Sequence, residues 1–269
     1  MAREGKQKLS KIAVVTGGGS GLGEACARKL AKDGMKTVLL DLNIGDAEAV
    51  AESIRTSGGS AHAMQIDVAD VDAMEDAAQR IQADYGTPTA LVTAAGIIES
   101  VSTVLDADME AHDRLWAINY GGTLNACRSF GRLMREEGAG SIVTVGSINS
   151  YVALPLPAYC PSKTAILRLV EMLCVELGRY GVRVNGVAPT YVLTPALQKR
   201  VEDGNRSLDT MLKVNATKKM VEPIDIANVV SFLLSDDARA VTGHMMPVDA
   251  GYLPTTTFAS FAGGQPWSE

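Results

Sequence analysis

A glycine-rich turn between an apolar run and a helical pattern constrains the fold of this chain more than any other feature. Residues 12–15 are apolar throughout, which is typical of a strand buried on both faces. Residues 24–33 have helical spacing. Between them the glycines follow T-G-x-x-x-G-x-G, from Thr16 to Gly23, and the stricter G-x-G-x-x-G pattern fits in no register. Such a turn presents a pyrophosphate to the positive end of a helix, so it predicts nucleotide binding; the alternative is a simple tight loop.

Further apolar runs follow the first, and segments with helical spacing separate most of them. The runs that predict strands are residues 37–40, 61–66, 90–93, 142–145, 182–188 and 243–248. The segments that predict helices are residues 46–57, 71–85, 106–116 with a continuation to 135, 157–180 and 224–234. This alternation predicts a doubly wound α/β fold, with a mainly parallel seven-stranded sheet and helices on both faces. We expect residues 1–269 to form a single domain, with a polar lid at about 190–220.

Composition excludes several classes of protein. Of 269 residues, 46% are hydrophobic and 21% charged, which is unlike a disordered or membrane protein. The formal net charge of -6 argues against a nucleic-acid partner, because phosphate binding relies on clustered Lys and Arg. Residues 1–8 are charged and lack the apolar segment of a signal peptide, and no apolar run approaches membrane-spanning length. We expect a soluble, cytoplasmic protein that binds neither nucleic acid nor membrane.

The cysteines and histidines are too scattered to suggest a metal site or a disulfide framework. They are Cys26, Cys127, Cys160, Cys174, His62, His112 and His244, and no pair of cysteines has C-x-x-C spacing. We predict no metal.

Asp41 stands at the end of the second predicted strand, eighteen residues beyond Gly23. An acid at about this distance is placed to accept hydrogen bonds from a ribose 2′-hydroxyl and would repel a 2′-phosphate. Asp41 therefore predicts NAD rather than NADP as the cofactor. The alternative is an acid that only caps the turn after the strand.

Tyr159 and Lys163 are the clearest candidates for chemistry. Of the seven tyrosines, only Tyr159 has a lysine four residues later, and on a helix this spacing puts the two side chains on one face. An ammonium beside a phenol favours the phenolate, so the phenol could act as an acid or base near neutral pH. Ser147, at the carboxyl end of the fifth predicted strand, could hold the substrate oxygen. The alternative is a solvated helix face without function.

Asn119 interrupts a helical pattern at a point where an irregularity is expected. An amide there could orient a water or a lysine; the alternative is that it bonds only to backbone.

Apolar residues beyond the needs of one sheet suggest contacts between subunits. The helix at 157–180 carries Ile166, Leu169, Val170, Leu173 and Leu177 on one face. The tail at 252–269 is rich in aromatic residues, namely Tyr252, Phe258, Phe261 and Trp267, and we expect it to cover a neighbouring subunit.

Together these residues resemble the short-chain dehydrogenase/reductase family over residues 10–251. The matching features are Thr16-Gly17-x-x-x-Gly21-x-Gly23, Asp67-Val68, Ala94-Ala95-Gly96, Asn119, Ser147, Tyr159-x-x-x-Lys163 and Pro189. The resemblance implies a Rossmann-like fold, an NAD(P) cofactor and a homotetramer. It makes Tyr159 the general base, Ser147 the group that polarises the substrate oxygen, and Asn119 the holder of a relay water. Lys163 would lower the phenol pKa and bind the nicotinamide ribose.

The same resemblance implies a set of cofactor-binding residues. They are Gly17, Gly19, Ser20, Gly21, Leu22, Gly23, Asp41, Leu42, Asp67, Val68, Ala94, Ala95, Gly96, Tyr159, Lys163, Pro189, Val192 and Thr194. Two positions depart from the family pattern. Thr93 replaces an asparagine, so a side-chain bond that steadies the central strand is lost, and Thr190 replaces a glycine after Pro189.

We therefore predict an NAD-dependent oxidoreductase that interconverts a secondary alcohol and a ketone, with a small sugar, polyol or hydroxy acid as substrate. The residues expected to contact substrate are Ser147, Asn149, Tyr151, Leu154, Tyr159 and Tyr191. The nearest alternative is a 3-oxoacyl-thioester reductase, as for acyl carrier protein substrates. A non-catalytic NAD-binding scaffold is an alternative of a different class.

Overall fold

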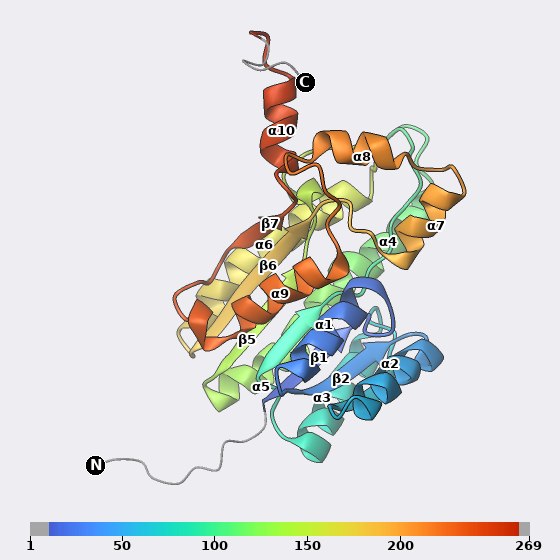
Figure 1. Ribbon diagram of the computed structural model, residues 1–269. Coiled ribbons are helices and arrows are strands. Elements are labelled where there is room, and N and C mark those ends of the chain that lie inside the picture. Colours follow the sequence, from blue (N-terminus) through green and yellow to red (C-terminus); the bar gives the residue numbers. More distant parts are fainter. Residues whose placement is uncertain (1–10, 264–269) are drawn as a thin grey trace.

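The computed structural model describes residues 11–263, and these contain one parallel sheet of seven strands with helices on both faces (Figure 1). The strands are β1 (Ile12–Thr16), β2 (Lys36–Asp41), β3 (Ser60–Gln65), β4 (Ala90–Thr93), β5 (Gly140–Val145), β6 (Val182–Pro189) and β7 (Met245–Val248). Their spatial order is β3-β2-β1-β4-β5-β6-β7, and every neighbouring pair is parallel. The Rossmann-like, doubly wound fold predicted from the sequence is confirmed. The chain reverses direction across the sheet between β1 and β4, where ligands of such folds bind.

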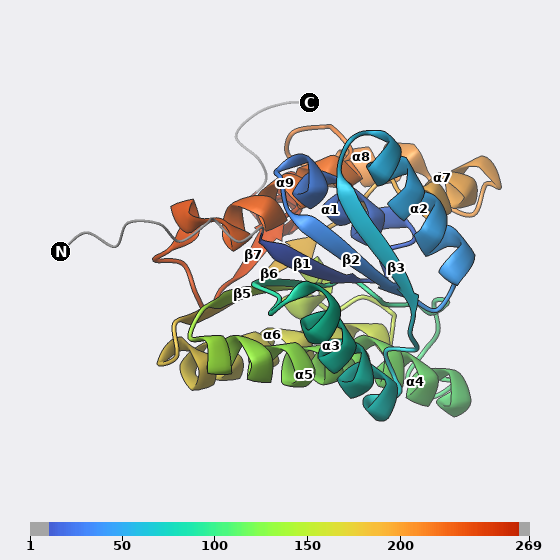
Figure 2. The same cartoon turned by 90° about the horizontal axis from the view of Figure 1, so that it is seen from below.

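Helices cover the two faces of the sheet in separate layers (Figure 2). They are α1 (Gly21–Lys32), α2 (Ile44–Thr56), α3 (Val71–Tyr85), α4 (Met109–Trp116), α5 (Gly122–Glu137), α6 (Tyr159–Gly178), α7 (Pro195–Glu202), α8 (Leu208–Val214), α9 (Pro223–Leu234) and α10 (Tyr252–Ala259). On β1, Val14 packs with the layer of α3, α5 and α6, whereas Ala13 and Val15 pack with α1, α2 and α9. Alternate residues of a strand point to opposite faces, so a strand buried on both sides must be apolar throughout.

Side-chain caps set where several helices begin. Asn43 accepts hydrogen bonds from the N–H groups of Gly45 and Asp46 at the start of α2, and Asp70 accepts one from Ala73 at the start of α3. Asp108 caps α4 in the same way, so this helix begins at Met109 rather than at 106 as predicted. These polar residues satisfy the unpaired donors of a first helical turn.

Between α4 and α5 the chain forms a short π-helix, Ala117–Gly121, which contains Asn119. A π-helical turn holds one residue more than an α-helical one, and such turns are frequent at functional sites. The irregularity expected around Asn119 is therefore present.

The expectation that α6 offers an apolar face to another subunit is wrong for the residues named. All five are buried within the protomer, because α6 packs on strand β6 of the sheet and on the neighbouring helix α5. They are Ile166, Leu169, Val170, Leu173 and Leu177. The apolar side chains that α6 does expose are Met172 and Val175.

The segment at 190–220 forms α7 and α8, and the described part of the tail forms α10, which projects from the body of the protein (Figure 1). Tyr252 is buried and packs edge-on against Tyr191, with 6.1 Å between ring centroids. Phe258 and Phe261 are 53% and 66% exposed. Trp267 lies outside the described residues. Within residues 11–263, no helix has the length and apolarity needed to cross a bilayer.

Candidate active site

The glycine turn leaves β1 and enters α1 with almost no room for side chains. Gly17 has a φ of +66°, and its N–H donates to the Leu40 carbonyl oxygen at 2.8 Å. A Cβ at Gly23 would lie 2.0 Å from the carbonyl oxygen of Gly17, so only glycine lets α1 start this close to the turn. The result is an open cradle of backbone at the positive end of α1.

Asp41 lies at the end of β2, beside this cradle. Its Oδ2 accepts the N–H of Gly19 at 2.9 Å, and its Oδ1 accepts the N–H of Asn43 at 3.0 Å. The two bonds fix the carboxylate while it faces the cavity described below. Asp41 therefore both steadies the glycine turn and offers oxygen atoms to a ligand.

The ends of β3 and β4 complete this half of the site. Val68 is held from behind by Asn125, whose Nδ2 donates to the Val68 carbonyl oxygen at 3.0 Å. The N–H of Ala95 donates to Thr16 Oγ1 at 3.3 Å. The hydroxyl of Thr93 is buried and has no hydrogen-bond partner among the described residues, in keeping with the stabilising bond expected to be lost there. The hydroxyl of Thr190 is also unpartnered.

Three of the four candidate catalytic residues come from two places in the fold, the end of β5 and the start of α6. Ser147 follows β5 and caps a short 3-10 helix, Ile148–Ser150, through a bond from the N–H of Asn149 at 3.1 Å. Tyr159 and Lys163 occupy the first turns of α6. Lys163 Nζ donates to the Val145 carbonyl oxygen at 2.8 Å and lies 5.5 Å from the Tyr159 ring centroid.

Burial dominates the protonation of this pair. It raises the pKa of Tyr159 to about 12, and the nearby Ser147 side chain offsets this only partly. Burial also lowers the pKa of Lys163 to about 8. Without cofactor the phenol is therefore protonated at neutral pH, and its pKa lies above the ordinary value rather than below it. The expected effect of Lys163 on the phenol pKa needs a further positive charge at the site.

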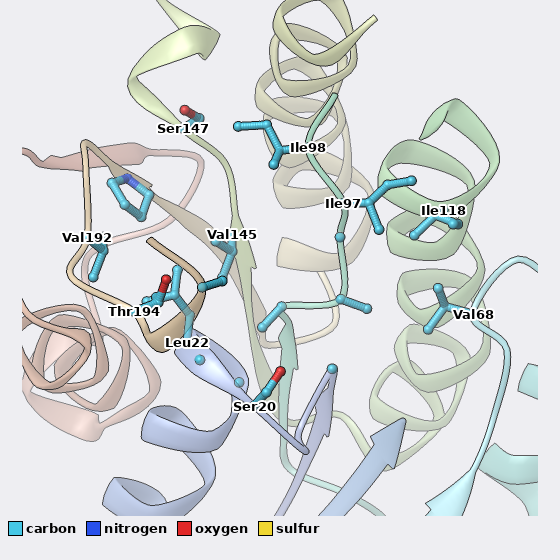
Figure 3. Close-up of a pocket in the computed structure, with 18 of the residues that line it drawn as sticks. Ser20, Leu22, Val68, Ile97, Ile98, Ile118, Val145, Ser147, Val192 and Thr194 are labelled. Carbon is cyan, nitrogen blue, oxygen red and sulfur yellow. The ribbon is translucent and has the colours of Figure 1, made fainter. Parts of the chain in front are cut away.

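A cavity of about 550 Å³ joins the two halves of the site along the carboxyl edge of the sheet (Figure 3). Leu22 and Thr194 lie together on one side of it, Val68 and Ile118 on the other, and Ser147 near Ile98 at one end. The predicted residues that line it are Gly17, Ser20, Gly21, Leu22, Gly23, Asp41, Leu42, Asp67, Val68, Ala94, Ala95, Gly96, Ser147, Tyr159, Lys163, Pro189, Val192 and Thr194. Residues between positions 17 and 196 thus meet at one cavity.

Six predicted residues do not line this cavity. Gly19 lies within the glycine turn and donates its N–H to Asp41, and Asn119 bonds to the backbone of Ile97. The others belong to the predicted substrate contacts, namely Asn149, Tyr151, Leu154 and Tyr191.

Three of these four substrate candidates use their side chains in contacts with other residues of the protein, and Leu154 makes its contacts through its backbone. Asn149 Oδ1 accepts the Ser147 hydroxyl at 3.1 Å, and the Tyr151 hydroxyl donates to the Met245 carbonyl oxygen at 2.5 Å. The backbone of Leu154 contacts Cys160 Sγ, and Tyr191 packs on Tyr252. Their direct role in substrate binding stays a prediction.

Several lining residues were not named from the sequence. They are Ile66, Ile97, Ile98, Arg114, Ile118, Val145, Gly146, Thr190, Pro195 and Ala196. Most adjoin a predicted residue, as Ile97 and Ile98 follow Gly96, so extending each motif by two residues would have found them. Arg114 and Ile118 lie one helical turn apart just before Asn119, and that spacing was the only available signal.

The residues present fit a dinucleotide. The glycine turn packs tightly on the end of β4, where a Cβ at Gly17 would come within 2.8 Å of Ala95 Cα, and residues of both segments line the cavity. Asp41 offers acceptors for a ribose, and the far end carries a phenol, a hydroxyl and an ammonium. Within the described residues, no group of three His, Cys, Asp or Glu side chains could hold a metal ion.

A glycine cradle and a tyrosine–lysine pair on one edge of a parallel sheet define the class as nucleotide-binding α/β oxidoreductases. A family model described as enoyl-(acyl carrier protein) reductase matches residues 17–253. The chain is 36% identical over 243 residues to D-threitol dehydrogenase of Mycolicibacterium smegmatis, covering 90% of this chain and 92% of that protein. It is 35% identical over 246 residues to short-chain dehydrogenase reductase 3a of Arabidopsis thaliana, covering 90% and 95%. The chain belongs to the short-chain dehydrogenase/reductase family, whose members act on CH–OH groups.

Solved structures support this assignment. A structure described as ribose-5-phosphate isomerase from Brucella melitensis 16M has a TM-score of 0.89 and 35% identity, covering 96% of this chain and 98% of that chain. NAD+-bound xylitol dehydrogenase has a TM-score of 0.84 and 28% identity, covering 90% and 99%. Other structural relatives hold NADP, so the family uses both dinucleotides.

Proposed function

We propose that this protein is an NAD-dependent dehydrogenase that interconverts a secondary alcohol of a small polyol, sugar or hydroxy acid with the corresponding ketone. The observation that carries the proposal is the meeting of Ser147, Tyr159 and Lys163 on one cavity whose other end holds Asp41. The names of two relatives, D-threitol dehydrogenase and xylitol dehydrogenase, support a polyol.

In the proposed complex, the glycine turn and the start of α1 hold the pyrophosphate, and Asp41 binds the adenosine ribose. Asp67 and Val68 flank the adenine, and Lys163 and Thr194 lie toward the nicotinamide end. NAD+, when bound, supplies the acceptor for the hydride of the alcohol carbon and a positive charge beside the phenol.

The protein's own residues handle the proton. Ser147 donates a hydrogen bond to the substrate oxygen and fixes it next to Tyr159. In the direction of oxidation, the phenolate oxygen of Tyr159 takes the hydroxyl proton of the alcohol as the carbon loses its hydride. Lys163, as the ammonium, stabilises the phenolate. Because burial alone puts the phenol pKa near 12, oxidation should become faster as the pH rises.

The preference for NAD is part of the proposal and rests on Asp41. A 2′-phosphate would place a second anion against a carboxylate whose two oxygens are already fixed by backbone N–H groups. Asp41 can accept ribose hydroxyls without moving, whereas a phosphate would meet repulsion.

The same proposal includes the assembly, a homo-oligomer with the tetramer of the family as the default. It also keeps the expected cytoplasmic location.

Reduction of NAD+ with a panel of D-threitol, xylitol, gluconate and hydroxysteroids tests the activity. The panel also includes 3-oxoacyl and enoyl thioesters with NADPH, since the description of the matching family model favours an acyl substrate as the second candidate. The proposal predicts turnover with at least one polyol or hydroxy acid. Turnover confined to the thioesters would replace it with the second candidate.

Tyr159→Phe separates an enzyme from a scaffold. Lost turnover with retained NAD binding, measured by calorimetry, supports the catalytic assignment. Unchanged turnover of the variant would exclude Tyr159 as the base.

A further inference from the structure

The catalytic helix α6 begins without a cap from its own sequence. Its N-cap residue is Ala158, which has no side chain able to accept a hydrogen bond. The N–H of Cys160 donates to the Leu156 carbonyl oxygen at 3.1 Å, and Pro161 has no N–H. The donors of Ala158 and Tyr159 therefore need an acceptor from elsewhere, since unpaired donors at a helix start are costly.

Glu99 supplies that acceptor from a loop 60 residues earlier in the chain. Its Oε1 accepts the N–H of Ala158 at 2.8 Å and the N–H of Tyr159 itself at 2.7 Å. Both are short bonds to an ionised acceptor, which are among the stronger hydrogen bonds in proteins. Glu99 is half-buried. The backbone of the candidate base is thus held by a side chain outside its own helix.

The loop that carries Glu99 is also tied to Asn119. Asn119 Oδ1 accepts the N–H of Ile97 at 2.8 Å, and Asn119 Nδ2 donates to the Ile97 carbonyl oxygen at 2.9 Å. Ile97 and Ile98 line the cavity between these two attachment points. The N–H of Ser102 donates to the Pro155 carbonyl oxygen at 3.3 Å, a further bond to the segment before α6.

We propose that Glu99 is a positioning residue, which sets the place of Tyr159 relative to Asn119 and to the cavity wall by capping α6 from the β4–α4 loop. The inference rests on the proposed role of Tyr159 as the base. Glu99 does not line the cavity, so it acts through the backbone of Tyr159.

Three substitutions separate the bonds from the charge. Both N–H groups share Oε1, and Oε2 has no hydrogen-bond partner among the described residues, so Glu99→Gln keeps the cap and removes the charge. Glu99→Asp keeps the charge but is one methylene too short to reach both donors. Glu99→Ala removes both. Ser100→Ala, an exposed neighbour in the same loop, is the matched control.

The readouts are kcat and KM across pH for the fastest polyol of the panel, together with NAD affinity and Tm.

We expect Glu99→Ala to lower kcat by about 10- to 100-fold, the scale of a small misplacement of a catalytic group, with NAD affinity within about threefold. Glu99→Gln should keep kcat within about threefold of the parent, because it keeps the acceptor for both N–H groups. Glu99→Asp should lose kcat, as Glu99→Ala does. Ser100→Ala should change neither quantity.

Full kcat in Glu99→Ala would overturn the inference, as would a loss in Glu99→Gln equal to that in Glu99→Ala. If Glu99→Ala does not fold, Glu99→Gln is compared with Glu99→Asp instead. Equal losses of kcat in these two variants would overturn the inference. Failure of the proposed function has a different signature, because Tyr159→Phe would then keep its turnover whatever the Glu99 variants do.

Discussion

Asn119 and Ile97 are joined by two hydrogen bonds that use both polar atoms of the Asn119 side chain. Oδ1 accepts the Ile97 N–H at 2.8 Å, and Nδ2 donates to the Ile97 carbonyl oxygen at 2.9 Å. The amide is fully buried in the π-helix between α4 and α5. The side chain thus holds the cavity wall through its bonds to backbone, and the expected role of Asn119 in holding a relay water stays a prediction.

Asn119→Leu should therefore lower kcat by about 10- to 100-fold, because Ile97 and the loop to Glu99 lose their attachment. Asn125→Leu is the matched control. Asn125 is a buried asparagine on α5 whose side chain holds Val68 rather than Ile97. The Asn125→Leu variant should weaken NAD binding and leave kcat nearly unchanged. Steady-state kinetics and calorimetry of both variants make the comparison, and equal losses of kcat would contradict it.

Asp41→Ala should weaken the preference for NAD. The variant loses a charged acceptor for the ribose and the two N–H bonds to Gly19 and Asn43. Loss of hydrogen bonds to a charged group costs about 1.5–3 kcal/mol each, so kcat/KM for NAD should fall by roughly tenfold or more while that for NADP rises. Asp46→Asn, which changes a nearby exposed carboxylate, should leave the NAD to NADP ratio unchanged. Comparable efficiency of the parent enzyme with both dinucleotides would refute the role of Asp41.

Lys163→Met should make the protein more stable at neutral pH, although it lowers the activity. Burial lowers the pKa of Lys163 from 10.5 to about 8, so the unfolded chain binds this proton more tightly than the folded one. The cost of burying the ammonium is complete below about pH 8, on the order of 3 kcal/mol, and disappears as the pH rises to 10.5. The difference in Tm between variant and parent should therefore shrink across this window. A constant difference would show that the lysine is not destabilised by burial.

Lys163→Met should also move the acid limb of the oxidation rate to higher pH, because the phenolate of Tyr159 loses its neighbouring cation. The pH dependence of kcat, followed by NADH absorbance, measures this shift.

Gly23→Ala should abolish cofactor binding and lower the Tm. The added Cβ would lie 2.0 Å from the Gly17 carbonyl oxygen, so the glycine turn would have to move away from α1. Gly178→Ala is the control, since a Cβ there meets nothing within 4 Å and its φ is not positive. That change should be neutral or stabilising by up to about 1 kcal/mol. Retained NAD affinity in Gly23→Ala would show that the cradle does not bind the pyrophosphate.

The combined variant Phe258→Ser and Phe261→Ser should reduce the size of the assembly in light scattering. These side chains are 53% and 66% exposed on and just after α10, and exposed aromatic area is favourably buried by another subunit. Phe232→Ser on α9, where the ring is 42% exposed, is the control. An unchanged molar mass would exclude the tail as a subunit contact.

Features that depend on neighbouring residues in the chain could be predicted from the sequence. The apolar runs at 12–15 and 142–145 predict strands covered on both faces, and the glycine spacing predicts the turn next to α1. The alternation of strands and helices predicts the parallel sheet, but it leaves the order of the strands open. The meeting of Ser147 and Tyr159 at the cavity could also be predicted, because both residues follow the carboxyl end of a strand of this sheet.

Features that depend on contacts between residues far apart in the chain could not be predicted from the sequence. Nothing near Glu99 in the sequence indicates that it caps a helix 60 residues away. Tyr151 was assigned to the substrate because it is close to Ser147 in sequence, but its hydroxyl bonds to Met245, 94 residues later. The phenol pKa was expected to fall because of Lys163, and burial, which no local pattern reveals, has the opposite and larger effect on the protein alone.

The π-helix of Ala117–Gly121 limits how the sequence of this chain can evolve. Its extra residue sets the rotation of α4 relative to α5, and deletion of one residue there would turn one helix by about 100° against the other. Asn119 would leave Ile97 even if every side chain were kept. This stretch can accept substitutions but not changes of length, so insertions and deletions among relatives should accumulate in surface turns such as the one between α7 and α8.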